Sequence, residues 1–220
     1  MVKIVEPKYE IITPIDGEYI IKHLEICARN CYKSEDRITE DSSRKMIAKL
    51  IELKHEAMIE HFSITVKFTT DLSFYKDVTR HRIASFAIES TRYCMYAKEK
   101  FGSELTVTKP CNITEGTPEY KEWLKCMEDI ERAYLAMAAL GCKPDQCRML
   151  LPHSVKADVI LTANLREWRH IFRLRAAKAA HPCIQELMKP LLKEFSQKIP
   201  VVFDDLLYLL EEETPAAKAV

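Results

Sequence analysis

Apolar residues recur at helical spacing, three or four positions apart, along most of the chain and predict a fold dominated by helices. Residues that favour helix ends agree with this spacing, because Thr117-Pro118 can cap and begin a helix and Gly141 can end it. Asn164 can likewise cap a helix that reaches Arg175. The expected helices begin after Gly17, surround 46–51, follow Asp71, cover 118–141 and 144–151, run from Asn164 to Arg175, and cover 184–198, with a kink at Pro190, and 204–212.

Strand patterns are fewer and shorter. Residues 63–69 alternate strictly between polar and apolar side chains, which indicates a strand with one buried face. Residues 2–13 are expected to form short strands broken at Pro7 and Pro14. The apolar stretch 155–163 fits either a strand or a helix, and we expect a helix there. Short strands and many helices without a β-α-β alternation predict an α+β fold that is rich in helices.

The balance of charges narrows the possible partners. The chain of 220 residues holds 33 lysines and arginines and 33 aspartates and glutamates, so it has no general attraction to nucleic acid or to an anionic membrane. No apolar run approaches the ~20 residues that cross a bilayer, and the first residues lack the apolar core of a secretory signal. The eight cysteines form no Cys-x-x-Cys pair and are expected to be reduced. We therefore expect a soluble cytoplasmic protein that binds neither nucleic acid nor membrane.

The predicted helix from Asn164 to Arg175 carries much of the candidate chemistry. The apolar residues of this helix lie opposite a basic arc formed by Arg166, Arg169, His170 and Arg173. Such an arc is typical either of a solvated helix face or of an anion-binding site. Arg175 instead falls among the apolar residues, beside Trp168 and Phe172. An arginine stays protonated and is costly to bury alone, so a partner with polar or negative oxygen atoms is implied. A core carboxylate, or snorkelling to solvent, would satisfy Arg175 equally well.

Residues 80–92 combine further groups that suit anions. Arg80, His81 and Arg82 are consecutive and cannot all point one way, so they can reach two surfaces or two ligands. The stretch Glu89-Ser90-Thr91-Arg92 adds hydroxyl donors and another guanidinium, which suit a phosphate and the polar edge of a nucleobase. A surface cluster of ion pairs is the alternative. We expect no metal site in the stretch His55 to His61, because its two histidines are six positions apart rather than four.

At this point the chain resembles the family of flavin-dependent thymidylate synthases. The family signature, Arg-His-Arg, seven residues and then Ser, is matched by Arg80-His81-Arg82 and Ser90. Four further stretches resemble family blocks in order and spacing, and the set is far more specific than any single motif. These stretches are 31–36, 55–61, 144–152 and 164–175.

The resemblance implies an enzyme with a flavin-dependent thymidylate synthase-like fold, in which residues 1–220 form a single, helix-rich α+β domain with a small, mostly antiparallel sheet. It implies FAD as cofactor, dUMP as substrate, methylenetetrahydrofolate and NADPH as cosubstrates, and a homotetramer whose active sites are shared between subunits. The residues it assigns to FAD are Ala57, Arg80, His81, Arg82, Ile88, Asn164, Leu165, Arg166 and His170. The residues it assigns to dUMP are Asp77, Val78, Thr79, Arg80, Ile88, Glu89, Ser90, Thr91, Arg92, Arg148 and Arg175.

Arg175 has the catalytic role in this assignment. It would face the uracil ring and favour ionisation at N3, which activates the ring carbon. This role agrees with the position of Arg175 among apolar residues, because a fixed and desolvated cation stabilises negative charge that develops beside it. The family is not expected to use a cysteine nucleophile.

Four positions depart from the family pattern. Ala57, Asp77, Ile88 and Met95 stand where a Ser or Thr, a Gln, a Gln or Glu, and an Asn are common. Asp77 and Ile88 change the polarity of positions that are expected to face the nucleotide. Two alternatives therefore stay open: a slow, degenerate member of the family, and an RNA- or nucleotide-binding module that uses the basic residues.

Overall fold

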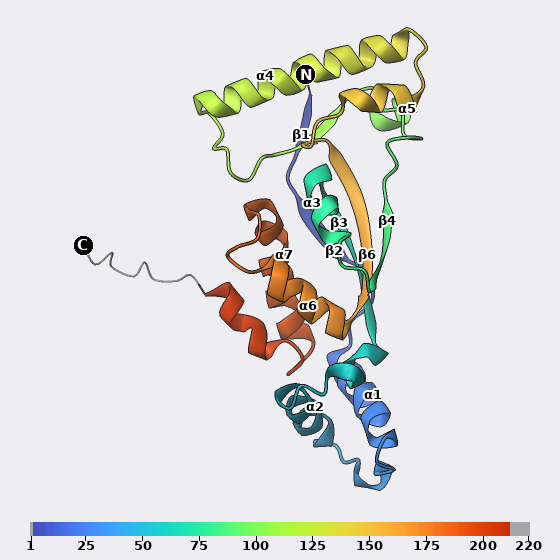
Figure 1. Cartoon of the computed structure of the whole chain (residues 1–220), viewed down its shortest axis with the longest axis vertical. Coiled ribbons are helices and arrows are strands. Elements are labelled where there is room, and N and C mark those ends of the chain that lie inside the picture. Colours follow the sequence, from blue (N-terminus) through green and yellow to red (C-terminus); the bar gives the residue numbers. More distant parts are fainter. Residues whose placement is uncertain (1, 212–220) are drawn as a thin grey trace, which may run out of the picture. The chain divides into compact units, whose positions relative to one another are not determined.

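The computed structural model describes residues 2–211, and the chain forms two compact units, each assembled from two separate segments (Figure 1). The first unit comprises the chain up to Ile12 together with Thr65–Thr162. The second unit comprises Thr13–Ile64 together with the chain from Ala163 onward. The expectation of a single domain over the whole chain stays a prediction.

A four-stranded sheet is the main β structure, and its strand order is β2-β3-β6-β4. Strand β2 runs antiparallel to β3, with Lys8 opposite Thr69. Hydroxyl contacts of 2.9 Å join Thr65 to Thr162 and Thr69 to Asp158, so β3 and β6 also run in opposite directions. A second sheet pairs β1 with β5 in parallel. The strands are β1 (Lys3–Val5), β2 (Lys8–Ile11), β3 (Ser63–Asp71), β4 (Ala84–Ile88), β5 (Thr106–Thr108) and β6 (Lys156–Asn164).

The helix expected over 155–163 is wrong, because this segment forms strand β6 (Figure 1). Side chains along β6 alternate between buried and half-buried, and the buried positions are Ala157, Val159, Leu161 and Ala163. The strand lies between β3 and β4, so both of its edges have neighbours. The opposite face carries Lys156, Asp158, Thr162 and Asn164 and is apolar only at Ile160. The alternation of a strand is therefore present in the sequence, but the apolar run 159–161 interrupts it.

Helices of the first unit begin where the sequence predicts. Asp71 caps α3 by accepting a hydrogen bond from the Phe74 amide, and Thr117 caps α4 by accepting one from the Tyr120 amide. Gly141, just beyond α4, has a φ of +85°, which favours glycine. The helices are α3 (Leu72–Val78), α4 (Pro118–Ala139) and α5 (Pro144–Cys147), and the 3-10 helices are η3 (Glu99–Phe101) and η4 (Arg148–Leu150).

The second unit is almost entirely helical, as the spacing of its apolar residues predicts. Its elements are α1 (Gly17–Asn30), η1 (Glu35–Arg37), α2 (Ser42–Glu52), η2 (Glu56–His61), α6 (Leu165–Arg175), α7 (Pro182–Lys198) and η5 (Asp204–Leu210). The last helix differs from its expected form, because η5 is a 3-10 helix and position 212 of the expected range lies outside the described residues. Rings of Trp168, Phe172, Phe195 and Phe203 pack together with centroid distances of 5.3 to 5.8 Å. These rings join α6, α7 and the start of η5 in one core.

The cysteines depart in part from the expectation that all are reduced. Cys111 and Cys183 are disulfide-bonded, so the expectation is wrong for these two. The other six, Cys27, Cys31, Cys94, Cys126, Cys142 and Cys147, are free thiols. Within residues 2–211, no helix is both long and apolar enough to span a membrane.

Candidate functional site

The Arg-His-Arg motif lies in the first unit, in the turn between α3 and β4. Its side chains diverge as consecutive residues must, because His81 is buried whereas Arg80 and Arg82 are exposed. Neither arginine has an ion-pair partner among residues 2–211, so the alternative of a surface salt-bridge cluster does not describe them. Two exposed guanidiniums without carboxylates beside them are suited to bind an anion from solution.

A tight turn follows β4 and presents the second half of the motif. The Ser90 carbonyl accepts hydrogen bonds from the amides of Tyr93 at 3.1 Å and Cys94 at 2.9 Å, which fix the turn. Arg92 is exposed, and its guanidinium carbon lies 5.6 Å from the centre of the Tyr93 ring. The turn therefore offers a guanidinium and short polar side chains to solvent.

One hydrophobic core holds both this turn and the start of η4. Met95, Tyr96 and Cys147 belong to this core. Arg92 precedes Met95 by three positions and Arg148 directly follows Cys147, so the core holds the backbone near both arginines. Met95 is buried, and its sulfur accepts a hydrogen bond from the Tyr134 hydroxyl at 3.5 Å. Burial in this core gives a physical reason for an apolar residue at position 95.

Glu89 is occupied by contacts within the first unit. Its carboxylate accepts hydrogen bonds from the Tyr96 hydroxyl at 3.0 Å, the Lys156 ammonium at 2.8 Å and the Asp158 amide at 3.3 Å. Burial, and then the Glu89 charge, raise the pKa of the Tyr96 hydroxyl, so this group stays protonated and donates. Burial lowers the pKa of Lys156, but Glu89 and Asp158 outweigh it and raise the pKa overall. The contacts of Glu89 thus hold the turn in place, and its binding of dUMP stays a prediction.

Other residues assigned to dUMP lie around α3 and β4 in the same unit. Val78 is completely buried, and the Thr79 hydroxyl donates to the Tyr75 carbonyl at 2.8 Å. These two residues therefore offer a ligand main-chain atoms more readily than side chains. Asp77 and Ile88 are both half-buried, the latter at the end of β4, and nothing in the structure explains why they replace the usual residues.

The second unit carries the other residues assigned to FAD, on α6 and η2. Asn164 caps α6, because its side-chain oxygen accepts a hydrogen bond from the Glu167 amide at 2.8 Å. Leu165 is buried, and its amide donates to the Phe62 carbonyl at 3.0 Å, which ties α6 to the end of η2. Ala57 on η2 and His170 on α6 are exposed. The FAD assignments are therefore divided between the two units, and each group stays a prediction.

Arg169 shows that the basic arc of α6 is not simply a solvated face. Its side chain is completely buried, and its guanidinium binds two carboxylates, those of Glu56 and Asp205. Burial raises the pKa of Glu56, but Arg173 and Arg169 outweigh this effect and hold the pKa below its ordinary value of 4.5. Burial likewise raises the pKa of Asp205, and Arg169 outweighs it, so that this pKa also lies below its ordinary value.

Arg175 lies at the last turn of α6. It is half-buried, whereas Trp168 and Phe172, which share its side of the helix, are completely buried. Leu174 beside it is exposed, so Arg175 faces away from the most open side of α6. Arg175 therefore lies on the side of α6 that its angle around the helix predicts. Its catalytic role stays a prediction.

Sequence reasoning missed the residues that support the site. Glu56 and Asp205 carry no signal of pairing, because they lie 113 and 36 positions from Arg169. Lys156 was missed for the same reason, since it lies 67 positions from Glu89. Tyr96 is only seven positions from Glu89, but the turn that brings the two together has no helical or strand spacing. Spacing within a helix reveals only neighbours three or four positions apart.

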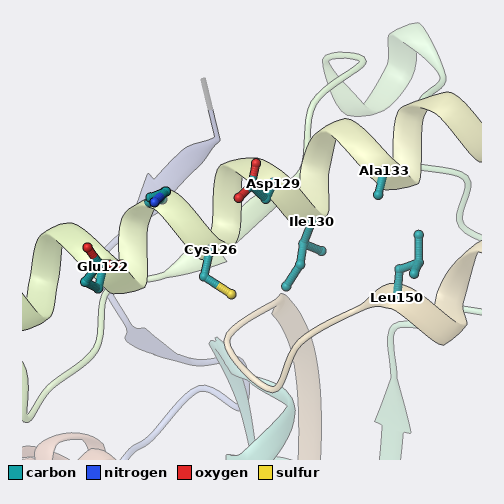
Figure 2. A pocket seen from close by; sticks show the side chains of 7 residues that line it. Glu122, Cys126, Asp129, Ile130, Ala133 and Leu150 are labelled. Atoms are coloured by element: carbon teal, nitrogen blue, oxygen red, sulfur yellow. The ribbon is translucent and has the colours of Figure 1, made fainter.

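Two hollows of the first unit differ in their relation to the predicted site. A cavity of about 380 Å³ beside α4 is lined by residues from α4 and by Leu150, as Figure 2 shows, and none of the residues assigned to FAD or dUMP lines it. Another cavity, of about 370 Å³, is lined by Glu89, Tyr96 and Lys156. The second cavity therefore lies against the contacts that hold the turn after β4.

The lowered pKa of Glu56 predicts how stability depends on pH. A carboxylate with a lowered folded pKa stabilises the fold above its ordinary value, and this contribution is lost as the pH falls through the folded value. Glu56→Gln should therefore have a lower free energy of unfolding than the wild type at neutral pH, and the difference should shrink as the pH falls below about 4.5. Urea unfolding of both proteins across this range measures it, and a difference that does not change with pH would contradict the account.

The chain also resembles known proteins in sequence and in structure. The sequence pattern of the family described as thymidylate synthase complementing protein matches residues 20–201. A flavin-dependent thymidylate synthase from Pyrococcus furiosus is 30% identical over 168 residues, which cover 76% of this chain and 68% of that protein. A flavin-dependent thymidylate synthase from Geobacter sulfurreducens is 25% identical over 187 residues, which cover 82% of this chain and 79% of that protein.

A solved structure has the same fold. It is that of the UMP/dUMP methylase PolB from Streptomyces cacaoi bound with 5-Br dUMP, with a TM-score of 0.74 and 20% identity over 94% of this chain and 97% of that one. The fold is thus the helix-rich α+β fold with a small antiparallel sheet that the sequence predicts. The chain belongs to the family of flavin-dependent thymidylate synthases, and it is an enzyme of that family.

Proposed function

We propose that this protein methylates dUMP to dTMP, with FAD as cofactor, methylenetetrahydrofolate as the one-carbon donor and NADPH as the reductant. Membership of the family supports the reaction, and the relatives' names support the flavin and the thymidylate product. We also propose that the protein works in the cytoplasm. Its six free thiols favour a reducing compartment, whereas the disulfide-bonded Cys111 and Cys183 do not.

The observation that carries the proposal is that two exposed arginines are both attached to the same hydrophobic core. Arg92 and Arg148 come from segments 56 positions apart, yet both follow or precede residues of one hydrophobic core. Both guanidiniums are exposed, and neither has a carboxylate partner within the described residues. Two exposed cations attached to one core, with Ser90 and Thr91 next to Arg92 in the chain, suit a nucleotide monophosphate.

The donor groups of the predicted FAD residues suit this cofactor. Arg80 and Arg82 are exposed guanidiniums without acidic partners in the described chain, which matches the anionic pyrophosphate of FAD. Ala57 on η2 and His170 on α6 are exposed and add a small side chain and an imidazole. In our proposal Arg80, His81, Arg82, Asn164, Arg166 and His170 hold the cofactor, Leu165 positions α6, and Ile88 lies where cofactor and substrate meet.

Arg175 has the central chemical role in the proposed reaction. Reduced FAD, when bound, supplies the hydride that converts the transferred carbon to a methyl group. Arg175 holds a positive charge beside the uracil and favours loss of the N3 proton, and the resulting electron density activates the ring carbon. Arg175 acts through its charge and transfers no proton of its own in this scheme.

Exposed apolar side chains support a homotetramer with shared active sites. Tyr93 and Met149 are 76% and 82% exposed, and they directly follow Arg92 and Arg148. A second chain that covered these two side chains would bury apolar surface that otherwise faces solvent, which favours association. We therefore propose that the dUMP site forms where subunits meet.

Two alternatives have different signatures. An RNA-binding module should bind mixed RNA with an affinity that falls steeply with salt, and it should need no flavin. Arg166, Arg169 and Arg173 are already paired with carboxylates, which argues against this alternative. A slow, degenerate enzyme should gain turnover when Ile88→Gln restores a polar side chain.

A product assay with single omissions tests the proposed function. Purified protein with FAD, dUMP, NADPH and methylenetetrahydrofolate is expected to form dTMP, as measured by chromatography. Omission of any one component should abolish the product. Product formation without NADPH, or without the folate, would contradict the proposed roles of these cosubstrates.

A further inference from the structure

A segment outside the region that matches the family reaches the middle of the second unit. The family match ends at residue 201, and the segment 202–210 follows it. Val202, Phe203 and Leu206 of this segment are buried, and the Phe203 ring lies 5.8 Å from Phe172 on α6. The segment is therefore packed into the core of the unit.

The guanidinium of Arg169 is completely satisfied at this place. Asp205 binds it with both carboxylate oxygens, at 2.6 Å from Nη1 and 2.8 Å from Nη2. Nη1 also donates to the Val202 carbonyl, and Nε and Nη2 donate to Oε1 of Glu56 at 3.3 and 3.2 Å. Arginine has five N–H donors, and these five hydrogen bonds use all of them. Arg169 therefore has no donor left for a ligand.

These contacts connect the segment 202–210 to the turn η2. Glu56 is the first residue of η2, and its Oε1 also accepts a hydrogen bond from Arg173 at 3.1 Å. Glu60 near the other end of η2 pairs with Arg166. The side chains of Glu56 and Glu60 thus attach η2 to α6, and Arg169, which Asp205 orients, contributes two of the hydrogen bonds at Glu56.

We propose that Asp205 is a positioning residue for the flavin site, acting through Arg169 and Glu56 to fix η2 and the exposed Ala57. The inference rests on the proposed function, because it takes η2 and α6 as flavin-binding elements. A bidentate carboxylate restricts a guanidinium to one orientation, so loss of the Asp205 charge frees Arg169 to rotate away from Glu56. The turn then samples positions that do not fit the flavin.

The test compares three full-length variants with the wild type. Asp205→Asn removes the charge, Asp205→Glu keeps it as a rescue, and Asp204→Asn makes the same change at the exposed neighbouring residue of η5. Flavin affinity is measured by titration with FAD, and local opening is measured by amide hydrogen exchange of peptides that cover 55–62 in flavin-free protein. We expect Asp205→Asn to weaken FAD binding about tenfold and to speed exchange in this stretch, whereas the other two variants stay near wild type.

Coupling between sites is reciprocal, which gives a second measurement should Asp205→Asn fail to fold. Glu56→Gln should speed amide exchange at 203–207, at the far end of the contacts. The inference is overturned if exchange at 203–207 is unchanged in Glu56→Gln, or if Asp205→Asn binds FAD as the wild type does. A wild type that takes up no FAD overturns the proposed function instead.

Discussion

Arg175→Lys is expected to lower turnover about 100-fold while the protein keeps its FAD. Lysine preserves the charge, but its compact ammonium cannot reproduce the planar fork of the guanidinium that we propose faces the uracil. Because the charge stabilises the activated ring and not the bound substrate, kcat should fall far more than KM for dUMP rises. Steady-state kinetics of dTMP formation, with the FAD content determined from the visible spectrum, measure both quantities.

Arg132→Lys is a matched control for this prediction. Arg132 lies on α4, its side chain is 79% exposed, and among residues 2–211 it pairs only with Asp129 on the same helix. The same chemical change at this position should leave turnover unaltered. Near-normal activity of Arg175→Lys would show that the proposed catalytic role of Arg175 is wrong.

Arg169→Leu is expected to lower the free energy of unfolding by about 3–5 kcal/mol. The substitution removes a completely buried cation and leaves the Glu56 and Asp205 carboxylates without their main partner. Removal of one partner of a buried ion pair is costly, because the Glu56 carboxylate, whose side chain is only 11% exposed, stays poorly solvated. Urea unfolding at neutral pH, followed by circular dichroism, measures the change.

Arg132→Leu provides the comparison, because its ion pair with Asp129 lies in solvent. An exposed pair contributes about 0–1 kcal/mol, so this variant should unfold almost as the wild type does. Equal effects of the two substitutions would mean that the buried contacts of Arg169 contribute no more than a surface ion pair.

The sequence predicts most of the helices because local signals determine where they begin. Asp71, Thr117 and Asn164 each cap a helix with a side-chain oxygen, as their positions before apolar stretches suggest. Strand β6 was predicted wrongly although its outward positions are polar except for Ile160, because the apolar run 159–161 interrupts the alternation that identifies β3. Local patterns thus succeed where the alternation is continuous and mislead where a short apolar run breaks it.

The candidate site shows a similar division. The motif residues Arg80 and Arg82, and the turn that presents Arg92, are exposed, as residues that bind a ligand should be. Their supports were not predictable, because the partners of Glu89 and Arg169 lie far away in the sequence. Asp205 in particular lies in a segment that has no counterpart in the family match, so neither motif nor resemblance could indicate it.

The most direct test of the central claim is the visible absorption spectrum of the purified protein. The protein is incubated with FAD, freed of unbound cofactor by gel filtration, and then denatured so that any released flavin can be identified. The account predicts a yellow protein that releases FAD and is bleached by NADPH without oxygen. A colourless protein that takes up no FAD would contradict it.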